Sequence, residues 1–271
     1  MTGKQLNLEQ IKQEELSILS FIDSLCRKHD IRYCLAYGTL LGAVRHQGFI
    51  PWDDDIDICM PRPDYERFLK IWSKEINNKR TSFKLFSPQT NKAYYYEYAK
   101  IISSNTICKI NQPLEEIKGT GVWIDIFPLD GVPDYFFIHF WKLRILRGLR
   151  SLSVYTSVPK VNSIKSLCIY ILWKTIKKIG WKYFQKRVIS LSQHYKYNES
   201  NYVSVSVLAE NIKHKYNKEL FENITEVTFE AKKFYSPKDY HSYLKITYGD
   251  YMQLPSEEKQ VSNHSFEAYY K

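Results

Sequence analysis

The sequence predicts an α+β fold in which helices flank a mixed β-sheet and a helix-rich basic part follows. Two observations support this prediction. Helical and strand-like hydrophobic patterns are interleaved as far as about Gly131, which is typical of a sheet with helices packed on it. After Pro133, long basic and aromatic helical patterns replace them. We therefore expect a sheet-containing core over residues 1–132 and a helix-rich basic part over residues 133–271.

The first four predicted elements are a helix, a short strand, a helical turn and a second strand. Apolar residues recur every three or four positions over residues 6–29, which is the pattern of an amphipathic helix. Residues 31–37 are expected to form a strand that ends at Gly38, and residues 40–46 a helical turn. Acidic and apolar side chains alternate over residues 55–60, as they do in a half-buried strand.

The later elements follow from a helix start and from the change of composition after Pro133. Pro63 and Asp64 favour the first turn of a helix, which we expect to continue to about Ile76. β-branched and aromatic residues predict three more strands, and two long basic helical stretches follow. The strands are expected over residues 82–86, 94–102 and 122–127, and the helical stretches over residues 135–150 and 164–195.

Composition excludes several classes of protein. The chain has 271 residues, of which 44% are hydrophobic and 25% charged, so it can bury a substantial core and is not disordered throughout. The longest apolar run, 167–173, is much shorter than the roughly 20 residues that span a bilayer. The N-terminus is polar and mixed in charge, unlike a secretory signal. We therefore expect a cytoplasmic protein.

The cysteines are expected to be buried, reduced thiols. They are widely spaced, odd in number, and include no CxxC or CxxH pair that would indicate zinc. A cytoplasmic location also argues against disulfides. The five are Cys26, Cys34, Cys59, Cys108 and Cys168.

The positive charge is concentrated in one region. The whole chain carries a net charge of +10, and residues 134–190 contain 12 basic residues against one acidic residue, Asp134. Such a region predicts contact with an anionic partner. Basic helices with exposed aromatic residues are typical of proteins that lie on anionic membranes, although an ordinary pair of amphipathic helices with lysines in water gives the same pattern. No RNA- or DNA-binding motif accompanies the charge, so we expect no nucleic-acid partner.

The most informative segment is 52–58, Trp-Asp-Asp-Asp-Ile-Asp-Ile, with four carboxylates within five residues. Two like charges about 4 Å apart repel by roughly 4 kcal/mol at an effective dielectric constant near 20, so the acids must be solvated, protonated or neutralised by a cation. On a strand, Asp55 and Asp57 point to one face, while Ile56 and Ile58 point into the core. Paired carboxylates of this kind suit Mg²⁺ or Mn²⁺.

Other interpretations of this segment fit less well. A solvated acidic turn does not explain the isoleucines between the acids. A calcium-binding loop that starts at Asp53 would need glycine where Ile58 stands. Asp125 is a single acid within an apolar strand, where it is either a hydrogen-bonded core residue or a third member of the acidic site. We favour the second interpretation because the acidic pair needs a further ligand or a base.

A glycine turn precedes the acids. Gly38 lets backbone N–H groups approach an anion, and the helical turn after Thr39 adds a partial positive charge. A strand, Gly-Thr, a helix, an Asp-hydrophobic-Asp strand and a third Asp on a later strand together resemble the catalytic pattern of the nucleotidyltransferase fold. In that fold the glycine turn holds donor phosphates and three carboxylates hold metal ions.

Three longer motifs resemble the LicD family. Residues 37–68, YGTLLGAVRHQGFIPWDDDIDICMPRPDYERF, resemble its signature. Residues 121–133, GVWIDIFPLDGVP, resemble its second motif, and residues 248–255, YGDYMQLP, its third. Family members are phosphotransferases that move phosphocholine from CDP-choline to a sugar hydroxyl of teichoic acid or lipooligosaccharide, and fukutin-type relatives use CDP-ribitol.

The resemblance implies a reaction and a set of site residues. It implies Mg²⁺ or Mn²⁺, a CDP-choline or similar CDP-alcohol donor, a lipid-linked glycan acceptor and release of CMP. It also implies that the enzyme works at the inner face of the cell membrane, where such an acceptor lies. Matched to the motifs, the metal-binding pair is Asp55 and Asp57, the third ligand or general base is Asp125, and Asp53 is an alternative ligand. The residues that would contact the donor phosphates are Gly38 and Thr39. Arg45 and Lys100 would support the donor through their positive charge.

Several alternatives stay open from the sequence. The sequence does not fix whether Asp53 or Asp54 contacts the metal. Arg45 also fits an exposed helix end, Lys100 an outward-facing lysine, and His264 a surface position. Other reactions that fit the site are transfer of phosphoribitol or phosphoglycerol and nucleotidyl transfer from an NTP. A membrane-associated adaptor with a degenerate site is the non-enzyme alternative.

Overall fold

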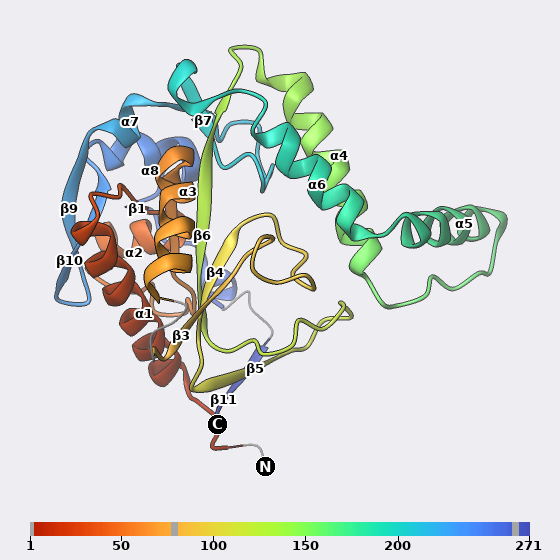
Figure 1. Cartoon of the computed structure of the whole chain (residues 1–271), viewed down its shortest axis with the longest axis horizontal. Helices are drawn as coiled ribbons and strands as arrows, with labels where there is room; N and C mark the ends of the chain where they lie inside the picture. The colour runs from red at the N-terminus through yellow and green to blue at the C-terminus, as the bar shows by residue number, and fades with distance from the viewer. Residues whose placement is uncertain (1–2, 77–80, 262–265) are drawn as a thin grey trace.

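The computed structural model describes residues 3–76, 81–261 and 266–271. Its centre is a mixed β-sheet with helices packed beside it, and a group of helices extends away from it on one side (Figure 1). None of the helices within these ranges is long and apolar enough to cross a membrane. The helices are α1 (Leu8–Lys28), α2 (Tyr37–His46), α3 (Arg62–Ile71), α4 (Phe136–Val154), α5 (Ile164–Ile179), α6 (Trp181–Ser192), α7 (Glu219–Glu222) and α8 (Tyr240–Tyr248), with shorter turns η1 (Trp72–Ile76), η2 (Tyr197–Glu199) and η3 (Glu257–Lys259).

The largest sheet has the strand order β1-β2-β6-β4-β3, and β7 and β8 extend it along the second half of β6. β2 and β6 run parallel, while β1, β4 and β7 pair antiparallel with their neighbours, which confirms the predicted mixed sheet. Two small antiparallel sheets, β9–β10 and β5–β11, complete the structure. The strands are β1 (Cys34–Leu35), β2 (Asp57–Pro61), β3 (Phe83–Phe86), β4 (Ala99–Ser103), β5 (Thr106–Ile110), β6 (Trp123–Val132), β7 (Tyr202–Ser204), β8 (Tyr216–Asn217), β9 (Ile224–Phe229), β10 (Lys232–Pro237) and β11 (Phe266–Tyr270).

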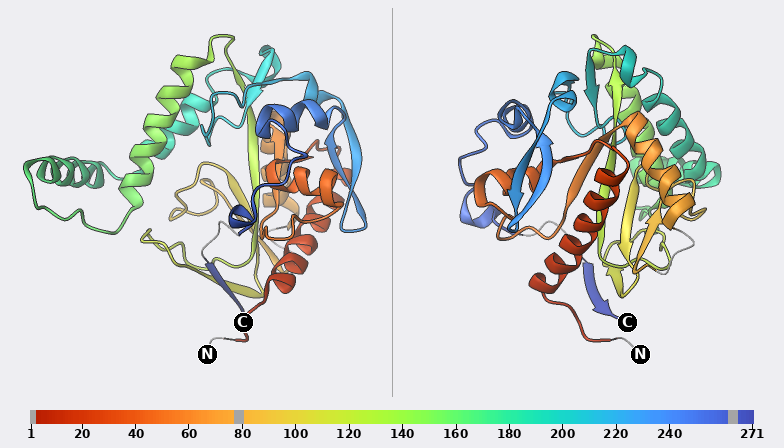
Figure 2. Two further views of the ribbon diagram at one scale, coloured as in Figure 1. Left: turned by 180° about the vertical axis from the view of Figure 1, so that it is seen from behind. Right: turned by 60° about the vertical axis from the view of Figure 1, so that its left-hand side comes forward.

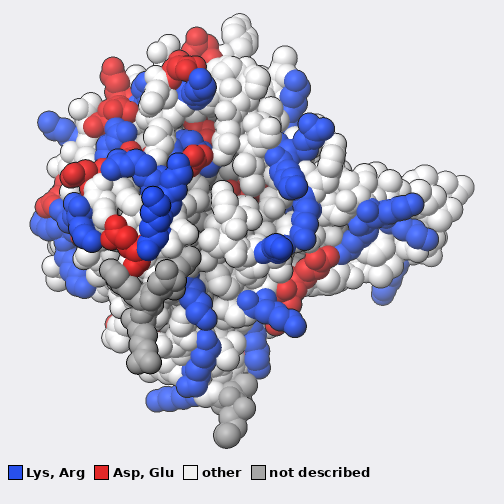
Figure 3. All heavy atoms as spheres, viewed as in Figure 1, with Lys and Arg blue, Asp and Glu red and all other residues white. Residues whose placement is uncertain are grey.

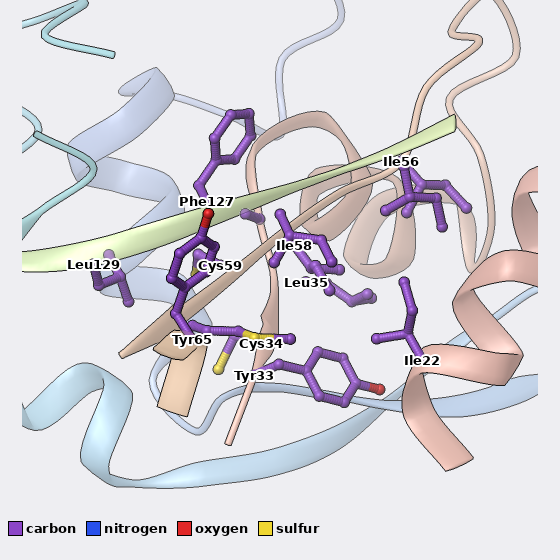
Figure 4. Packing of buried hydrophobic residues seen from close by; sticks show 14 of the residues in the cluster. Ile22, Tyr33, Cys34, Leu35, Ile56, Ile58, Cys59, Tyr65, Phe127 and Leu129 are labelled. Atoms are coloured by element: carbon purple, nitrogen blue, oxygen red, sulfur yellow. The ribbon is translucent and has the colours of Figure 1, made fainter. Parts of the chain in front are cut away.

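The hydrophobic core lies between the central strands and the N-terminal helix. Ile58 of β2 is paired in register with Ile126 of β6, and both are fully buried. α1 packs over this face of the sheet, and Figure 4 shows its Ile22 next to Ile56 and Ile58. Alternation along β2 and β6 therefore leaves the opposite face of these strands for the acidic side chains.

The C-terminal residues pack on the same core as α1. The main hydrophobic cluster extends from Ile18 to Tyr251 in the sequence. β10 packs beside β1, and α8 beside α2, as the two views of Figure 2 show. These contacts place the third sequence motif, 248–255, next to the first. The division into residues 1–132 and 133–271 stays a prediction.

Several element boundaries differ from those expected from sequence. β1 contains two residues, and α2 already begins at Tyr37, so Gly38 and Thr39 lie in the first turn of a helix rather than between a strand and a helix. β2 begins at Asp57, so Asp53 and Asp55 precede the strand. The strand expected over 94–102 is confined to β4, because the residues before Ala99 are not paired in the sheet.

Two other elements end elsewhere than expected, one because of pairing with a distant strand and one because of a glycine. β6 continues past Phe127 to Val132 because its second half pairs with β7, which lies 70 residues later in the chain. The helical stretch expected over 164–195 is divided into α5 and α6 at Gly180, whose φ of 82° is readily adopted by glycine. The expectation of five buried thiols is wrong for Cys168, which is exposed on α5, while the other four are buried and all five are free.

Candidate functional site

The centre of the candidate site is a row of three charged residues across three neighbouring strands. Asp57 of β2 is the register partner of Asp125 of β6, and Asp125 is the register partner of Lys100 of β4. Register partners have side chains on the same face of a sheet. The Lys100 Nζ lies 2.6 Å from Asp125 Oδ1, and these side chains are 10% and 16% exposed. The sheet thus assembles two predicted carboxylates and one predicted cation at a single place.

The start of α2 supports this row from the side. The Asp57 backbone N–H donates a 2.8 Å hydrogen bond to Thr39 Oγ1, which is buried. A Cβ at Gly38 would lie 2.7 Å from Asp53 Oδ2, so the Asp53 carboxylate fits against α2 only because this residue is glycine. Gly38 and Thr39 therefore join the first turn of α2 to the acidic segment.

The carboxylates are close enough to affect one another. Desolvation raises the pKa of Asp57 well above its usual value, the negative charges of Asp55 and Asp125 raise it further, and Lys100 opposes them. Glu15 of α1, which is 2% exposed, also has a strongly raised pKa, first because of burial and then because of Asp55 and Asp54. The site therefore holds more acidic groups than the sequence motif indicates.

This arrangement suits a cation. Hard carboxylate oxygens are the donors that Mg²⁺ and Mn²⁺ prefer, and a cation would relieve the repulsion from Asp55 and Asp125 that adds to burial in raising the pKa of Asp57. Lys100 already supplies one positive charge to Asp125. Within residues 3–76, 81–261 and 266–271, no group of three or more His, Cys, Asp or Glu side chains is arranged as a metal site. The donor chemistry fits a divalent ion, and the described geometry is that of an acid pair with a lysine counterion.

Arg45 lies at the other end of α2 and connects it to the third sequence motif. Its guanidinium donates a 3.0 Å hydrogen bond to the carbonyl of Tyr251. Tyr248, in the same motif, has a pKa raised by desolvation and then by the charges of Asp57 and Asp53. The third motif thus contacts α2 through Arg45 and lies near the acidic residues.

The segment before β4 is fixed by a buried ion pair. The Arg150 guanidinium of α4 donates two hydrogen bonds to the Glu97 carboxylate, at 2.9 and 3.0 Å, and both residues are at most 4% exposed. α6 adds the Gln185 amide, which donates hydrogen bonds to the carbonyls of Tyr94 and Tyr96. Two helices of the basic part therefore hold the residues that lead to Lys100.

Sequence patterns missed some residues of this site. Glu15 and Tyr248 were not candidates, although an acid at a core-facing position of the apolar stripe of α1 is a usable signal. The sequence also did not indicate the aromatic rings around Lys100, because strand register decides which side chains lie next to it. Lys232 and Lys233, at the start of β10, are exposed, and His264 lies outside the described residues.

The chain is similar to known proteins over nearly its whole length. Residues 30–144, which contain all eight predicted site residues, match the LicD/FKTN/FKRP nucleotidyltransferase domain. The chain is 32% identical over 277 residues to the lipopolysaccharide cholinephosphotransferase LicD of Haemophilus influenzae, covering 98% of this chain and 99% of that protein.

Two other relatives are uncharacterized proteins. The Rickettsia typhi protein is 43% identical over 25% of this chain and 20% of its own length. The Rickettsia prowazekii protein is 32% identical over 49% of this chain and 43% of its own length. Because both proteins are uncharacterized, these shorter matches indicate no reaction.

Proposed function

The chain belongs to the LicD family and is a phosphotransferase, and from this premise we propose that it transfers phosphocholine from CDP-choline to a sugar hydroxyl of a cell-surface glycan precursor. The observation that carries the proposal is the row of Asp57, Asp125 and Lys100, in a chain that aligns over nearly its whole length with a cholinephosphotransferase. The acceptor would be a precursor of teichoic acid or of a lipopolysaccharide-type glycan.

The reaction is an in-line displacement at phosphorus. The acceptor oxygen forms a bond to the phosphorus that carries choline, the bond from this phosphorus to the CMP oxygen breaks, and CMP leaves with the electron pair. Mg²⁺ or Mn²⁺, held by Asp55, Asp57 and Asp125, would neutralise the donor diphosphate. Asp53 is the alternative ligand beside them. Asp125 either completes this ligand set or accepts the proton of the sugar hydroxyl.

Other residues of the chain position these groups. Thr39 fixes the backbone of Asp57, and the first turn of α2 offers its N-terminal N–H groups to a donor phosphate. Lys100 is paired with Asp125 in this structure. Once another group neutralises the Asp125 carboxylate, the flexible Lys100 side chain can turn its ammonium toward the phosphates of the donor. Arg45 supports the donor less directly, through the third motif.

The test is CMP release from CDP-choline with Mg²⁺, measured with and without a lipid-linked or soluble amino-sugar acceptor. Wild type should release CMP faster with acceptor, and Asp57→Asn should release at least about a hundredfold less. Asp134→Asn, an exposed acid outside the site, is the matched control and should behave as wild type. No acceptor-stimulated CMP from CDP-choline would overturn the proposal.

The product separates this reaction from its nearest alternatives. CMP released from CDP-ribitol or CDP-glycerol, but not from CDP-choline, would indicate transfer of another phospho-alcohol. This alternative is relevant because the matched domain family also includes fukutin-type proteins. Pyrophosphate released from an NTP would indicate nucleotidyl transfer. The degenerate-site adaptor is disfavoured because the chain belongs to an enzyme family and keeps Asp55, Asp57 and Asp125.

We also propose that the enzyme works at the inner face of the cell membrane, where a lipid-linked acceptor would lie. α5 projects from the rest of the molecule in Figures 1 and 2, and among the described side chains of this helix only Ile176 is fully buried. Its Ile171 and Leu172 are more than half exposed, next to exposed Lys174 and Lys178. Apolar and basic side chains on one projecting helix complement the interface of an anionic lipid surface.

A further inference from the structure

The ammonium group of Lys100 is surrounded by aromatic rings. Its Nζ lies 4.4 Å from the ring centroid of Trp123, 5.1 Å from that of Tyr96 and 5.6 Å from that of Tyr98. All three distances are within the range of cation–π attraction. Lys100 is 8% exposed, so its charge is stabilised by these rings and by the Asp125 carboxylate rather than by bulk water.

The rings belong to the face of the sheet that carries the acids. Trp123 precedes Asp125 by two residues on β6, which places both side chains on the same face. Tyr96 and Tyr98 lead into β4, and the ring of Tyr98 packs edge-on against Phe127, 4.6 Å away. Tyr96 and Trp123 are partly exposed, whereas Tyr98 is buried.

These rings suit a quaternary ammonium better than a primary one. The trimethylammonium group of choline has no N–H to donate, so aromatic faces can stabilise its charge where hydrogen bonds would stabilise the ammonium of a lysine. Among the described residues, the other cation over the ring of Tyr96 is Arg150, 5.7 Å from its centroid, and that charge is balanced by the buried carboxylate of Glu97. The field of the rings is therefore available to a further cation.

We propose that Tyr96, Tyr98 and Trp123 form the subsite for the trimethylammonium group of the donor, with the Lys100 ammonium occupying it in the free protein. This inference rests on the proposed transfer of phosphocholine and adds how the enzyme distinguishes choline from uncharged alcohols. When the donor binds, its cation replaces the lysine beside the rings, and the flexible Lys100 side chain turns toward the donor phosphates. The positive charge near Asp125 is thereby preserved.

A binding experiment tests the subsite without turnover. Phosphocholine and 3,3-dimethylbutyl phosphate have nearly the same shape and both carry a phosphate, but only phosphocholine carries a cationic group. Wild type should bind phosphocholine about tenfold more tightly, since cation–π attraction in a desolvated site contributes a factor of this order. Tyr96→Leu should reduce this preference at least about threefold, whereas Tyr96→Phe, which keeps the ring, should retain it.

A second tyrosine with a lysine above it provides the control. The Lys109 Nζ lies 5.0 Å from the ring of Tyr269 on β11, away from the acids. Tyr269→Leu should leave the preference for phosphocholine unchanged. Equal binding of the two phosphates by wild type, or an unchanged preference in folded Tyr96→Leu, would overturn the proposed subsite.

Removing the resident lysine gives the opposite result. Lys100→Met should bind free choline about tenfold more tightly than wild type, because the rings no longer hold the lysine ammonium. Free choline is the probe because it has no phosphate whose contact with Lys100 would be lost. Unchanged or weaker choline binding would show that the rings only seat Lys100. If wild type transfers phosphocholine but shows no preference for the cation, the subsite fails and the proposed function stands. If it binds phosphocholine selectively but releases no CMP from CDP-choline, the function fails and the subsite stands.

Discussion

At the scale of single residues, the site depends on strand register. Asp57 and Asp125 are register partners on parallel strands, so the sheet holds their side chains beside each other whatever their charge. Burial raises the pKa of Asp57 above its usual value, and the charges of Asp55 and Asp125 raise it further, so the ionised acid is unfavourable for folding. Lys100 opposes this shift at Asp57, but its direct ion pair is with Asp125. The two acids therefore differ in what they contribute to stability, although both belong to the site.

Asparagine substitutions should separate stability from activity. Asp57→Asn removes a repelled charge and keeps the side-chain shape, so we expect an equal or higher melting temperature with transfer at least about a hundredfold lower. Asp125→Asn should lower transfer similarly but also lower the melting temperature, because the buried Lys100 loses its partner. Thermal unfolding and CMP release test both statements. A higher melting temperature for Asp125→Asn than for Asp57→Asn would contradict them.

His139 should make stability depend on pH. This α4 residue is 6% exposed, and among the described residues its Nε2 has no hydrogen-bond partner. Burial, then His194 and Lys142, lower the pKa of His139 to about 4. Between this value and the usual value of about 6.5, the unfolded chain binds a proton that the folded chain does not, so stability rises with pH across this window and levels off above it.

Substitution of His139 tests this dependence. His139→Leu should flatten the increase in unfolding free energy between about pH 4 and 6.5, as measured by urea denaturation at several pH values. Other groups contribute the remaining slope, so the comparison is between the variant and wild type. Identical slopes in the two proteins would show that His139 does not titrate as inferred.

At the scale of elements, the basic helices serve the sheet as well as the surface. The Glu97–Arg150 pair joins α4 to the segment that carries Tyr96 and Tyr98. Glu97→Gln should destabilise the protein by about 3–5 kcal/mol, because the Arg150 charge stays buried without its partner. The double variant Glu97→Leu with Arg150→Met should recover most of this loss in urea unfolding. A double variant less stable than Glu97→Gln would mean that the charged pair is required for folding itself.

Sequence patterns predicted those helices and strands that are determined by residues within their own segment. The apolar stripe of α1 and the helix start at Pro63 lie in the sequence segments that form these helices, and both predictions are confirmed. The second half of β6 depends on pairing with β7, which no pattern near Phe127 indicates. The strands after residue 200 were missed for the same reason, since they are short and are defined by distant partners.

The site was predictable to the same extent. An Asp-hydrophobic-Asp pattern and a single acid in an apolar strand indicated Asp55, Asp57 and Asp125, because alternation along a strand is a local property. Their proximity required the parallel pairing of β2 with β6. The pairing of Lys100 with Asp125, and the rings around it, required a third strand, whose alignment the sequence does not specify.

At the scale of the whole molecule, charge and shape are distributed unevenly. Some cations of the basic region form ion pairs: Arg150 pairs with Glu97 in the interior, and the Lys177 Nζ lies 3.1 Å from Glu115 Oε1 in a partly exposed pair. Others, such as Lys174 and Lys178, are exposed on α5. Figure 3 shows Lys and Arg side chains among uncharged surface on the projecting part. The sheet face with the acids and the projecting helix therefore present surfaces of different chemistry, one acidic and one basic and apolar.

Vesicle binding tests whether this asymmetry has the proposed use. Each exposed cation near an anionic membrane contributes about 1 kcal/mol, so Lys174→Gln with Lys178→Gln should weaken binding to anionic vesicles by about thirtyfold. Turnover of a soluble acceptor should change little, because neither residue contacts the acids. Lys84→Gln with Lys92→Gln, which removes two exposed lysines elsewhere, is the control and should bind vesicles more nearly as wild type. Equal losses of binding in both double variants would mean that only the net charge of the protein matters. Unchanged binding of the α5 variant would mean that Lys174 and Lys178 are ordinary solvated side chains.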